Sequence, residues 1–487
     1  MNNILDLPDH PIWDYFSEIL QIPRASGKEE KILAYLKDFA QNHNLAYLQD
    51  KPGNLLIKKE ATKGKENLET VILQSHIDMV CEKNMGTMHD FDKDPIQAQI
   101  NDGWIKADGT TLGADDGIGV ASQLAILAST EIEHGTIECL FTVDEESGMT
   151  GAMELGRDLL TGKILLNLDS EDEGELFIGC AGGIDTLATY EINFAISPGS
   201  HTAFKLFVNG LKGGHSGDEI QKGLGNSIKI LNRILWEGSK KFDLKVNSFR
   251  GGNLRNAIPR EAFSIFVIPN EKILSFQTFF TELSETIENE YSKTDPDLHI
   301  QLNETDLPGE VFEKSFQDNL LSALYACPHG ALSMSHDIEG LVESSTNLAS
   351  VKQINKNTLE ITTSQRSSVE SAKTDISQMV ESVFILSEAE VKHSGSYPGW
   401  TPNTDSIILG ITRSSYEKLF GNKAEVKAIH AGLECGLFLK KYPELDMISF
   451  GPTIKGAHSP DERLHIESTY KFWDLLLEVL KLIPEKK

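Results

Sequence analysis

The sequence predicts an α/β protein: a catalytic domain on a mainly parallel sheet, with an α+β domain inserted into it. Short apolar runs at residues 71–75, 136–143 and 163–168 are typical of strands that are buried on both faces. A small, apolar, helix-compatible segment at residues 117–129 separates the first two, and strands that alternate with helices favour a parallel sheet. Near Gly182 the pattern changes to a β-α-β-β series, which indicates the insertion.

The N-terminal part is predicted to be mostly helical. Residues 11–44 have apolar positions at helical spacing, and Ser26 followed by Glu29 has the pattern of a capping box. Residues 54–58 are expected to form a strand. In open α/β sheets, binding sites form beyond the carboxyl ends of the strands. The polar residues that follow the apolar runs are therefore the first candidates for a site.

The predicted domain boundaries are residues 1–186 and 395–487 for the catalytic domain and 187–394 for the insert. A Ser-, Gly- and Pro-containing stretch, residues 394–402, is interpreted as the return linker. Inside the insert we expect strands at residues 201–208, 242–249 and 261–268 and a helix at residues 222–236. After it we expect helices at residues 406–420 and 468–482 and strands at residues 423–428 and 447–450.

The composition restricts the partners. The chain has 487 residues, of which 40% are hydrophobic, so it can form a large core. It has 45 basic and 73 acidic residues, and its formal net charge is −28. Such a surface repels nucleic acid and anionic membranes, so neither is an expected partner.

Cysteine usage and hydropathy point to a cytoplasmic protein. The five cysteines are widely spaced and form no Cys-x-x-Cys pair, which argues against a disulfide framework and against a thiolate zinc site. The first ten residues lack the basic and apolar regions of a signal peptide. No run of about 18 apolar residues occurs, so no membrane span is expected.

The first chemical motif is His76 with Asp78, directly after the run at residues 71–75. An imidazole at a strand end can bind a metal ion, and Asp78 can accept the hydrogen bond of the other ring nitrogen, which fixes the tautomer. The alternative is a histidine whose hydrogen bonds are satisfied within the core, next to a capping aspartate.

The second motif is Asp115-Asp116 in a glycine-flanked turn. Two adjacent carboxylates repel each other unless a cation or hydrogen-bond donors are present. The alternative is a solvated turn or the N-cap of the helix at residues 117–129.

Three further stretches add candidate ligands. Glu145 and Glu146 follow the run at 136–143, and one could ligate metal while the other acts as general base. They could equally belong to an acidic loop. Asp169 is an oxygen ligand or part of an acidic surface turn, and His458 is a lone histidine in a Gly-Ser-Pro loop.

Together these residues predict a metal site. Nitrogen and oxygen ligands without thiolates suit zinc, manganese or cobalt, and zinc is the usual metal for hydrolysis. Two histidines and several carboxylates exceed one tetrahedral site. Two metal ions about 3.5–4 Å apart, bridged by a carboxylate and a water, would use them all.

The ordered set of motifs resembles the aminoacyl-histidine dipeptidases (Xaa-His or β-alanyl-histidine dipeptidases). These belong to the co-catalytic zinc peptidases, with aminoacylase, carnosinase and glutamate carboxypeptidase. The matching motifs, in family order over nearly the whole chain, are Ser75-His-Ile-Asp78, Gly113-Ala-Asp-Asp-Gly117, Asp144-Glu-Glu-Ser-Gly148, Asn167-Leu-Asp169, Gly213-Gly-His-Ser-Gly217, Gly251-Gly-Asn-Leu-Arg-Asn-Ala-Ile-Pro259, His430-Ala-Gly-Leu-Glu-Cys-Gly436 and Gly456-Ala-His-Ser-Pro460.

The resemblance implies a role for each metal ligand. His76 and Asp169 would hold one zinc ion, Glu146 and His458 the other, and Asp115 would bridge them with a cis peptide bond after it. Cobalt or manganese could substitute for the two zinc ions.

The resemblance also implies catalytic and substrate-binding roles. Asp78 would orient His76, Glu145 would be the general base, and His215 in the insert would stabilise the oxyanion, in its own or the partner subunit. The substrate contacts would be Asn253, Arg366 and His430. The insert would be a lid and dimerisation domain, and the protein a homodimer.

The resulting hypothesis is metal-dependent hydrolysis of dipeptides such as carnosine. One alternative is a related amidohydrolase on the same scaffold, such as an N-acyl amino acid acylase, a deacetylase or a tripeptidase. Another is a non-enzymatic acidic protein that buffers metal ions. The second leaves the adjacent pair Glu145 and Glu146 without an explanation.

Overall fold

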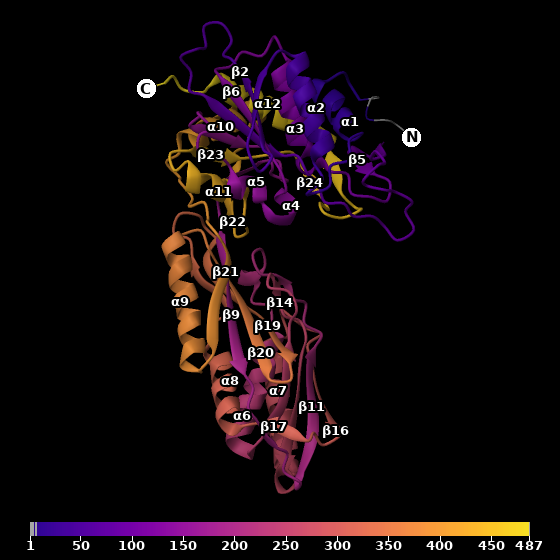
Figure 1. Ribbon diagram of the computed structural model, residues 1–487, viewed down its shortest axis with the longest axis vertical. Helices are drawn as coiled ribbons and strands as arrows, with labels where there is room; N and C mark the ends of the chain where they lie inside the picture. The colour runs from indigo at the N-terminus through magenta and orange to yellow at the C-terminus, as the bar shows by residue number, and fades with distance from the viewer. Residues whose placement is uncertain (1–3, 5–6, 487) are drawn as a thin grey trace. The chain divides into compact units, whose positions relative to one another are not determined.

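The computed structural model describes residue 4 and residues 7–486, and it divides into two compact units. Unit 1 comprises Met1–Gly179, Pro402–Ala428 and Leu433–Lys487, and unit 2 comprises Cys180–Thr401 and Ile429–Gly432. Each unit has its own sheets and helices (Figure 1). Within the described residues, no helix combines the length and the apolarity that a bilayer span requires.

The predicted boundaries, 186/187 and 394/395, fall inside two strands of unit 2. These are β9 (Gly182–Glu191) and β21 (Glu390–Tyr397), which pair antiparallel with Glu390 opposite Thr189. The ladder between them keeps both strands in the sheet of unit 2, so the chain leaves unit 1 earlier and returns later than predicted. The stretch interpreted as a return linker is accordingly strand as far as Tyr397.

Unit 1 is built on an eight-stranded sheet in the order β1-β2-β6-β3-β7-β23-β8-β22. Its central strands β6, β3, β7 and β23 are mutually parallel. Every residue of β3, β6 and β7 is buried, because helices such as α3 and α10 cover the sheet (Figure 1). This confirms the α/β prediction with a mainly parallel sheet.

The strands of unit 1 are β1 (Ala46–Gln49), β2 (Leu55–Lys59), β3 (Val71–His76), β4 (Ala98–Asn101), β5 (Trp104–Ala107), β6 (Ile137–Thr142), β7 (Ile164–Asn167), β8 (Glu175–Cys180), β22 (Glu425–Ile429), β23 (Asp446–Ser449), β24 (Ile454–Lys455) and β25 (Arg463–His465). Its helices are α1 (Pro11–Ile19), α2 (Glu30–Asn42), α3 (Ala114–Ala128), α4 (Glu145–Gly148), α5 (Thr150–Glu154), α10 (Ile407–Phe420), α11 (Glu434–Lys441) and α12 (Ile466–Lys481).

The predicted capping box is wrong. Helix α2 begins at Glu30 without a side-chain cap. The Ser26 hydroxyl instead donates a hydrogen bond to Asp78 (2.7 Å), and the Glu29 carboxylate accepts from the backbone amides of Gly27 (2.8 Å) and Asp144 (3.1 Å). Partners distant in sequence thus replace the local ones that the pattern predicts, and residues 20–29 are not helical.

A second sheet of unit 1 joins its first and last segments. The strand order is β24-β25-β5-β4, and Leu464 of β25 lies opposite Ile105 of β5. The turn between β24 and β25 carries His458, and the chain after β5 leads to Asp115. The pairing therefore brings two ligand candidates together that are 343 residues apart.

Unit 2 contains a nine-stranded sheet whose recorded pairings are all antiparallel. Besides β9 and β21, the strands of unit 2 are β10 (Phe194–Ile196), β11 (His201–Asn209), β12 (Gly214–His215), β13 (Lys245–Gly251), β14 (Ala257–Ile258), β15 (Ala262–Pro269), β16 (His299–Thr305), β17 (Glu310–Phe312), β18 (Gly330–Met334), β19 (Val342–Asn355) and β20 (Thr358–Ser367). Its α-helices are α6 (Ser227–Phe242), α7 (Ile273–Glu290), α8 (Lys314–Ala326) and α9 (Glu370–Leu386).

Helix α6 begins five residues later than predicted. The side chain of Asn226 accepts hydrogen bonds from the amides of Ile228 and Lys229, so Asn226 is the N-cap. The preceding residues Ile220–Lys222 form a separate 3₁₀ turn. The helix then continues to Phe242, where the strand at 242–249 was predicted to begin; the strand begins at Lys245 instead.

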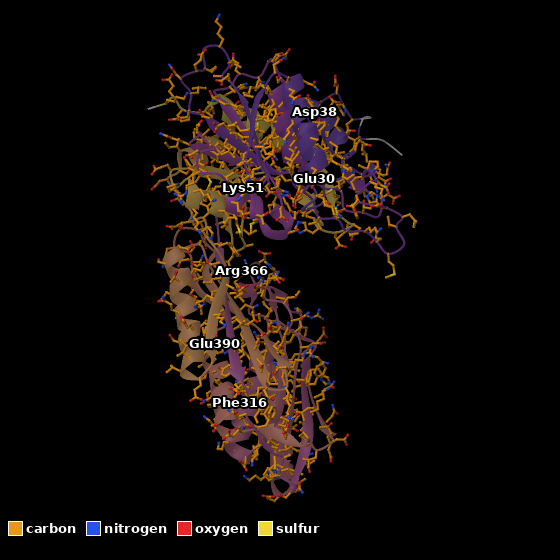
Figure 2. The ribbon with its side chains drawn as sticks, in the orientation of Figure 1. Glu30, Asp38, Lys51, Phe316, Arg366 and Glu390 are labelled. Carbon is orange, nitrogen blue, oxygen red and sulfur yellow. The ribbon has the colours of Figure 1, made fainter. Side chains whose placement is uncertain are left out.

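An aromatic cluster fills the core between the sheet of unit 2 and its helices. Phe276 of α7 is fully buried, and its ring lies 5.6 Å from those of Phe242 and Phe266. Phe316 of α8 belongs to the same core (Figure 2). Close packing of large rings makes this region sensitive to loss of volume.

Phe276→Ala should lower the free energy of unfolding of unit 2 by about 3–5 kcal/mol, because it removes a buried ring and leaves a cavity. Hydrogen exchange on the whole chain should show lost protection in β11 and β15 and unchanged protection in β3, β6 and β7. Phe263→Ala is the control, since that partly exposed ring lies under the Lys205 ammonium, 4.9 Å away. Equal loss in both units would show that they unfold together.

Candidate metal centre

Three parallel strands deliver polar side chains to one edge of the unit 1 sheet. His76 is the last residue of β3 and lies opposite Thr142, the last residue of β6. Gln74 of β3 lies opposite Asn167, the last residue of β7. Residues that directly follow β6 and β7 must therefore lie beside His76, as the strand-end argument predicted.

The Asp115 carboxylate lies between two imidazoles. Its Oδ1 is 3.0 Å from Nε2 of His76, and its Oδ2 is 3.2 Å from Nε2 of His458. The peptide bond between Asp115 and Asp116 is cis, as the family resemblance implies. One oxygen facing each histidine is the arrangement of a bridging ligand.

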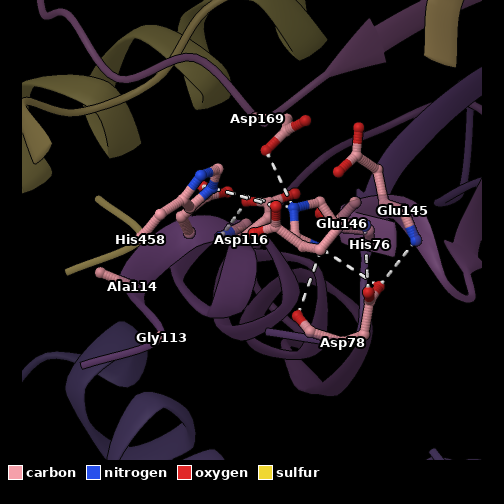
Figure 3. Close-up of polar contacts among 12 residues, drawn as sticks. His76, Asp78, Gly113, Ala114, Asp116, Glu145, Glu146, Asp169 and His458 are labelled. Carbon is pink, nitrogen blue, oxygen red and sulfur yellow. Dashed lines mark hydrogen bonds and ion pairs between the residues drawn. The ribbon is translucent and has the colours of Figure 1, made fainter. Parts of the chain in front are cut away.

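Each histidine has a second carboxylate of its own. Oδ1 of Asp169 lies 3.3 Å from Nε2 of His76, and Oε2 of Glu146 lies 3.0 Å from Nε2 of His458. The polar ends of these side chains converge (Figure 3). Asp169 is not part of a surface turn, because only 11% of its side chain is exposed.

These side chains fit metal ions. The ligand atoms of His76, Asp115 and Asp169 lie within 4.8 Å of one another, and so do those of Asp115, Glu146 and His458. All donors are nitrogen or oxygen, which suits zinc, cobalt or manganese. Among the described residues, the buried Oε1 of Glu146 has no hydrogen-bond partner.

The electrostatics also indicate a cation site. Hydrogen bonds with Asp115 and Glu146 raise the pKa of His458 to about 11. Burial lowers the pKa of His76, but Asp169 and Asp115 outweigh it and raise that pKa well above its ordinary value. Buried carboxylates in such numbers repel one another, and a metal ion relieves the repulsion as a proton does.

Asp78 holds the residues around it in place. Its Oδ1 lies 3.4 Å from Nδ1 of His76, and its carboxylate accepts from the backbone amides of Glu145 (3.1 Å) and Glu146 (3.2 Å) and from Ser26. Burial opposes ionisation, yet the contact with His76 brings the pKa of Asp78 down to about 2. Because β3 ends at His76, Asp78 reaches the imidazole from outside the strand.

Glu145 and Glu146 differ in what they face: Glu146 lies beside His458, whereas Glu145 does not contact that ring. They begin the short helix α4 and are not extended, and Asp144 before them has a left-handed φ of 55°. Burial raises the pKa of Glu145 to about 8 against the influence of His76, and Glu434 and Glu146 reinforce the rise. A carboxyl with so strongly shifted a pKa is a candidate for proton transfer.

Sequence reasoning did not single out Glu434, Glu462 or Arg24, and treated Asp116 only with Asp115. Glu434 is buried beneath the cluster and accepts hydrogen bonds from Gln74 (2.6 Å) and Thr142 (2.8 Å). Asp116 accepts from the amide of Gly119 (3.1 Å), so the alternative of a helix cap holds for Asp116 while Asp115 faces the histidines. Two of these carboxylates could have been found from their distance in sequence to a candidate histidine: Glu434 lies four residues after His430, and Glu462 lies four residues after His458. Arg24 had no such signal.

Unit 2 brings His215 close to His430. Nδ1 of His215 lies 3.1 Å from Oδ2 of Asp218. A Cβ atom at Gly217 would lie 2.6 Å from the carbonyl oxygen of His430 and 3.0 Å from Cε1 of His215, so only glycine permits this approach. His430 was predicted in the second catalytic segment, but Ile429–Gly432 belongs to unit 2, because Ser345 of β19 binds the His430 ring at 2.7 Å.

Arg366 of β20 belongs to the same region of unit 2. Its Nη1 donates to the Tyr397 hydroxyl (2.9 Å), and its charge acts on both Asp218 and His430. Within the described residues, the buried Nε of Arg366 and Nδ1 of His430 have no partner.

Asn253 lies in a cavity of about 720 Å³ that none of these residues lines, and it accepts a hydrogen bond from Lys352. Unit 2 therefore groups His215, Arg366 and His430 but not Asn253.

Comparison with known proteins identifies the class. Residues 72–482 match peptidase family M20/M25/M40. Over 486 residues, the chain is 43% identical to the cytosol non-specific dipeptidase of Escherichia coli (strain K12), with 100% of both proteins covered. The chain belongs to this peptidase family and is a hydrolase that acts on peptide bonds. Peptidases of this family are metal-dependent.

Solved structures agree with this assignment. The aminoacylhistidine dipeptidase of Vibrio alginolyticus matches with a TM-score of 0.95 and 45% identity, over 100% of this chain and 99% of that one. A tripeptidase from Staphylococcus aureus matches with a TM-score of 0.56 and 18% identity over 99% of both chains, which shows a shared fold alone. Membership of a peptidase family rules out the alternative of a non-enzymatic metal buffer.

Asp78→Asn should weaken metal binding about 10–100-fold, because the amide group presents N–H toward donors that need an acceptor. Titration of the metal-free protein against a chromophoric chelator measures this. Ser26→Ala removes only one hydroxyl from the same carboxylate and should change the affinity much less. Equal affinities in wild type and Asp78→Asn would contradict the positioning role of Asp78.

Burial and the charge of Arg366 lower the pKa of His430 to about 3. The ring should thus stay neutral from pH 8 to pH 5, and Arg366→Met should raise its pKa because a cation that repels the imidazolium is lost. Ring ¹⁵N shifts of histidine-labelled protein measure both, with His430→Gln for assignment. Arg255→Met is the control, since Arg255 pairs with Asp185 and should leave His430 unchanged. A wild-type midpoint above pH 6 would contradict this prediction.

Proposed function

We propose that this peptidase hydrolyses dipeptides, Xaa-His dipeptides such as carnosine among them, with two zinc ions per chain. The observation that carries the proposal is the Asp115 carboxylate, with one oxygen toward His76 and the other toward His458. In the proposed assignment, His76 and Asp169 hold one ion and Glu146 and His458 hold the other. Cobalt and manganese are the expected substitutes.

When bound, the metal pair lowers the pKa of a water molecule and polarises the scissile carbonyl group. The remaining chemistry belongs to the side chains. Glu145 accepts a proton from the attacking water and delivers it to the leaving amine, so that one C–N bond breaks and one C–O bond forms. Its pKa of about 8 falls when cations bind nearby, which leaves Glu145 ionised and ready to accept the proton.

Two residues have supporting roles in this proposal. Asp78 orients His76 and, through its bonds to two backbone amides, fixes the start of α4 where Glu145 and Glu146 lie. His215 donates a hydrogen bond to the carbonyl oxygen as negative charge develops on it. The carboxylate of Asp218 supports this role, because it lies 3.1 Å from Nδ1 and can hold the ring in one orientation.

The proposed substrate contacts are Arg366, His430 and Asn253. Within the described part of the chain, Arg366 has a buried N–H group without a partner, as a residue that binds a substrate carboxylate would have. A guanidinium fork pairs well with the free C-terminal carboxylate of a dipeptide. Burial and the charge of Arg366 lower the pKa of His430, and its Nδ1 has no partner among the residues that the structure describes, which supports a hydrogen-bonding role at the same substrate.

The size of the substrate, the assembly and the location complete the proposal. The names of the Escherichia coli and Vibrio alginolyticus relatives both specify dipeptides, though one is non-specific and the other is specific for aminoacylhistidine. Unit 2 is proposed to act as a lid and to form a homodimer, and the protein is proposed to be cytosolic, like its Escherichia coli relative. The alternative substrates are N-acyl amino acids and tripeptides.

The deciding experiment assays metal-loaded and chelator-stripped protein on carnosine, other Xaa-His dipeptides, dipeptides without histidine, N-acyl amino acids and tripeptides. Metal is counted per chain in each preparation. We expect dipeptide turnover that is lost on stripping and returns with zinc at two ions per chain. Cleavage of acyl amino acids or tripeptides alone would overturn the substrate, and turnover without metal would overturn the mechanism.

Glu145→Gln should lower kcat about 10²–10⁴-fold and leave the metal content unchanged, because an amide cannot accept the proton. Activity assays with metal analysis on the same samples measure this. Asp144→Asn is the control, since that neighbouring carboxylate binds the Thr150 hydroxyl (2.6 Å) and should tolerate the change. Near-normal turnover by Glu145→Gln would remove Glu145 from the base role.

A further inference from the structure

A buried carboxylate binds the backbone that leads to Asp115. Glu462 lies in the turn between β24 and β25, and it is 2% exposed. Its two oxygens accept hydrogen bonds from the consecutive amides of Leu112 (2.7 Å), Gly113 (3.0 Å) and Ala114 (2.7 Å), and a longer one from that of Asp115 (3.5 Å). Since the same turn carries His458, Glu462 links the chain on either side of the candidate metal centre.

Arg24 binds the other side of this backbone. Its guanidinium group is 2% exposed and donates to the carbonyl oxygens of Ile77 (3.1 Å) and Asp78 (2.7 Å) and to that of Gly113. Gly113 is thus held twice, by its amide through Glu462 and by its carbonyl group through Arg24. Figure 3 shows Gly113 and Ala114 beside the converging ligands.

The glycine is required for this arrangement. Gly113 has a left-handed φ of 72°, and a Cβ atom there would lie 2.7 Å from Nη2 of Arg24 and 2.8 Å from Sδ of Met79. The backbone can therefore approach the guanidinium group only without a side chain. The three carbonyl groups suit a planar fork of donors better than a single ammonium group.

We propose that Arg24 and Glu462 are positioning residues that set the place of the Asp115 carboxylate between the two metal ions. The inference rests on the proposed metal centre. Its five ligands lie in five segments, and this pair of side chains connects three of them: residues 76–78, residues 112–115 and the turn that carries His458. A bridging ligand tolerates little displacement, because it must reach two ions at fixed bond lengths at once.

A merely structural role is the competing explanation, and the chain contains a matched control for it. Glu138 of β6 is 1% exposed and accepts from the amides of Thr161 (2.9 Å) and Gly162 (3.0 Å) and from the Thr161 hydroxyl. It lies near the start of β6, whereas the candidate metal centre lies beyond the end of that strand. Glu138→Gln therefore disturbs a similar buried carboxylate without touching the ligands.

The test compares Glu462→Gln, Glu462→Asp and Glu138→Gln with the wild type in the full chain. Glu462→Gln loses the charge and one acceptor, while Glu462→Asp keeps the charge but is too short to reach three amides. Zinc affinity is measured by chelator competition, ligand geometry by the visible spectrum of the cobalt-substituted protein, and kcat and KM with a dipeptide that the wild type hydrolyses. Thermal unfolding reports stability.

We expect both Glu462 variants to lose about 10–100-fold in zinc affinity, to change the cobalt spectrum, and to lower kcat with little change in KM. Glu138→Gln should lower only the unfolding temperature. If Glu462→Asp behaves like the wild type, the negative charge alone explains the effect. If the Glu462 variants differ from the wild type only in unfolding temperature, the role is structural. Either result overturns the proposal.

The wild type tests the proposed function separately. If the wild-type protein binds no zinc or cleaves no dipeptide, that result contradicts the proposed function and not the role of Arg24 and Glu462. If Glu462→Gln does not fold, Arg24→Lys provides the same test from the other side. It keeps the charge, but one ammonium nitrogen replaces the two guanidinium nitrogens that bind the three carbonyl groups, so it should show the same loss of zinc affinity. Unchanged affinity and spectrum in Arg24→Lys would overturn the proposal.

Discussion

Mutual repulsion of buried carboxylates is the constraint that the rest of unit 1 satisfies. Asp115, Glu146 and Asp169 surround two imidazoles at the edge of the parallel sheet, and Glu145 lies beside them. Without cations, this cluster forces protons onto His76 and His458, as their raised pKa values indicate. A fold that retains such a cluster must hold it in place with many hydrogen bonds to the surrounding backbone and side chains.

The bonds form successive layers around the ligands. Asp78 touches His76 and the amides at the start of α4, so one carboxylate orients a ligand and the proposed base together. Behind it, the connection between α1 and α2 supplies Arg24, Ser26 and Glu29 to the backbone of the ligand-bearing segments and to Asp78. Glu462 completes the layer from the C-terminal side. Residues outside the proposed ligand set thereby hold the backbone of the candidate ligands.

Unit 2 differs from unit 1 in its sheet, in its core and in where its polar groups lie. Its sheet is antiparallel and its core aromatic. Its polar groups of interest lie on the short strand β12, on the long strand β20 and directly after β22. His215, Arg366 and His430 meet because Gly217 allows the backbone of residue 430 to approach and Ser345 binds the His430 ring. Burial next to a guanidinium group keeps His430 neutral, which leaves a donor and an acceptor where a charged ring would repel Arg366.

The sequence by itself determined the parallel core, the existence of the insertion and the ligand candidates, because apolar runs and the polar residues after them are local signals. It did not determine where the insertion begins and ends, since the ladder between β9 and β21 joins residues about two hundred positions apart. Nor did it reveal Arg24 and Glu462. It also misjudged Ser26, which binds Asp78, and Glu29, which binds Asp144 as well as the nearby Gly27. Local patterns record what a residue can do, but only the tertiary structure decides which distant partner it meets.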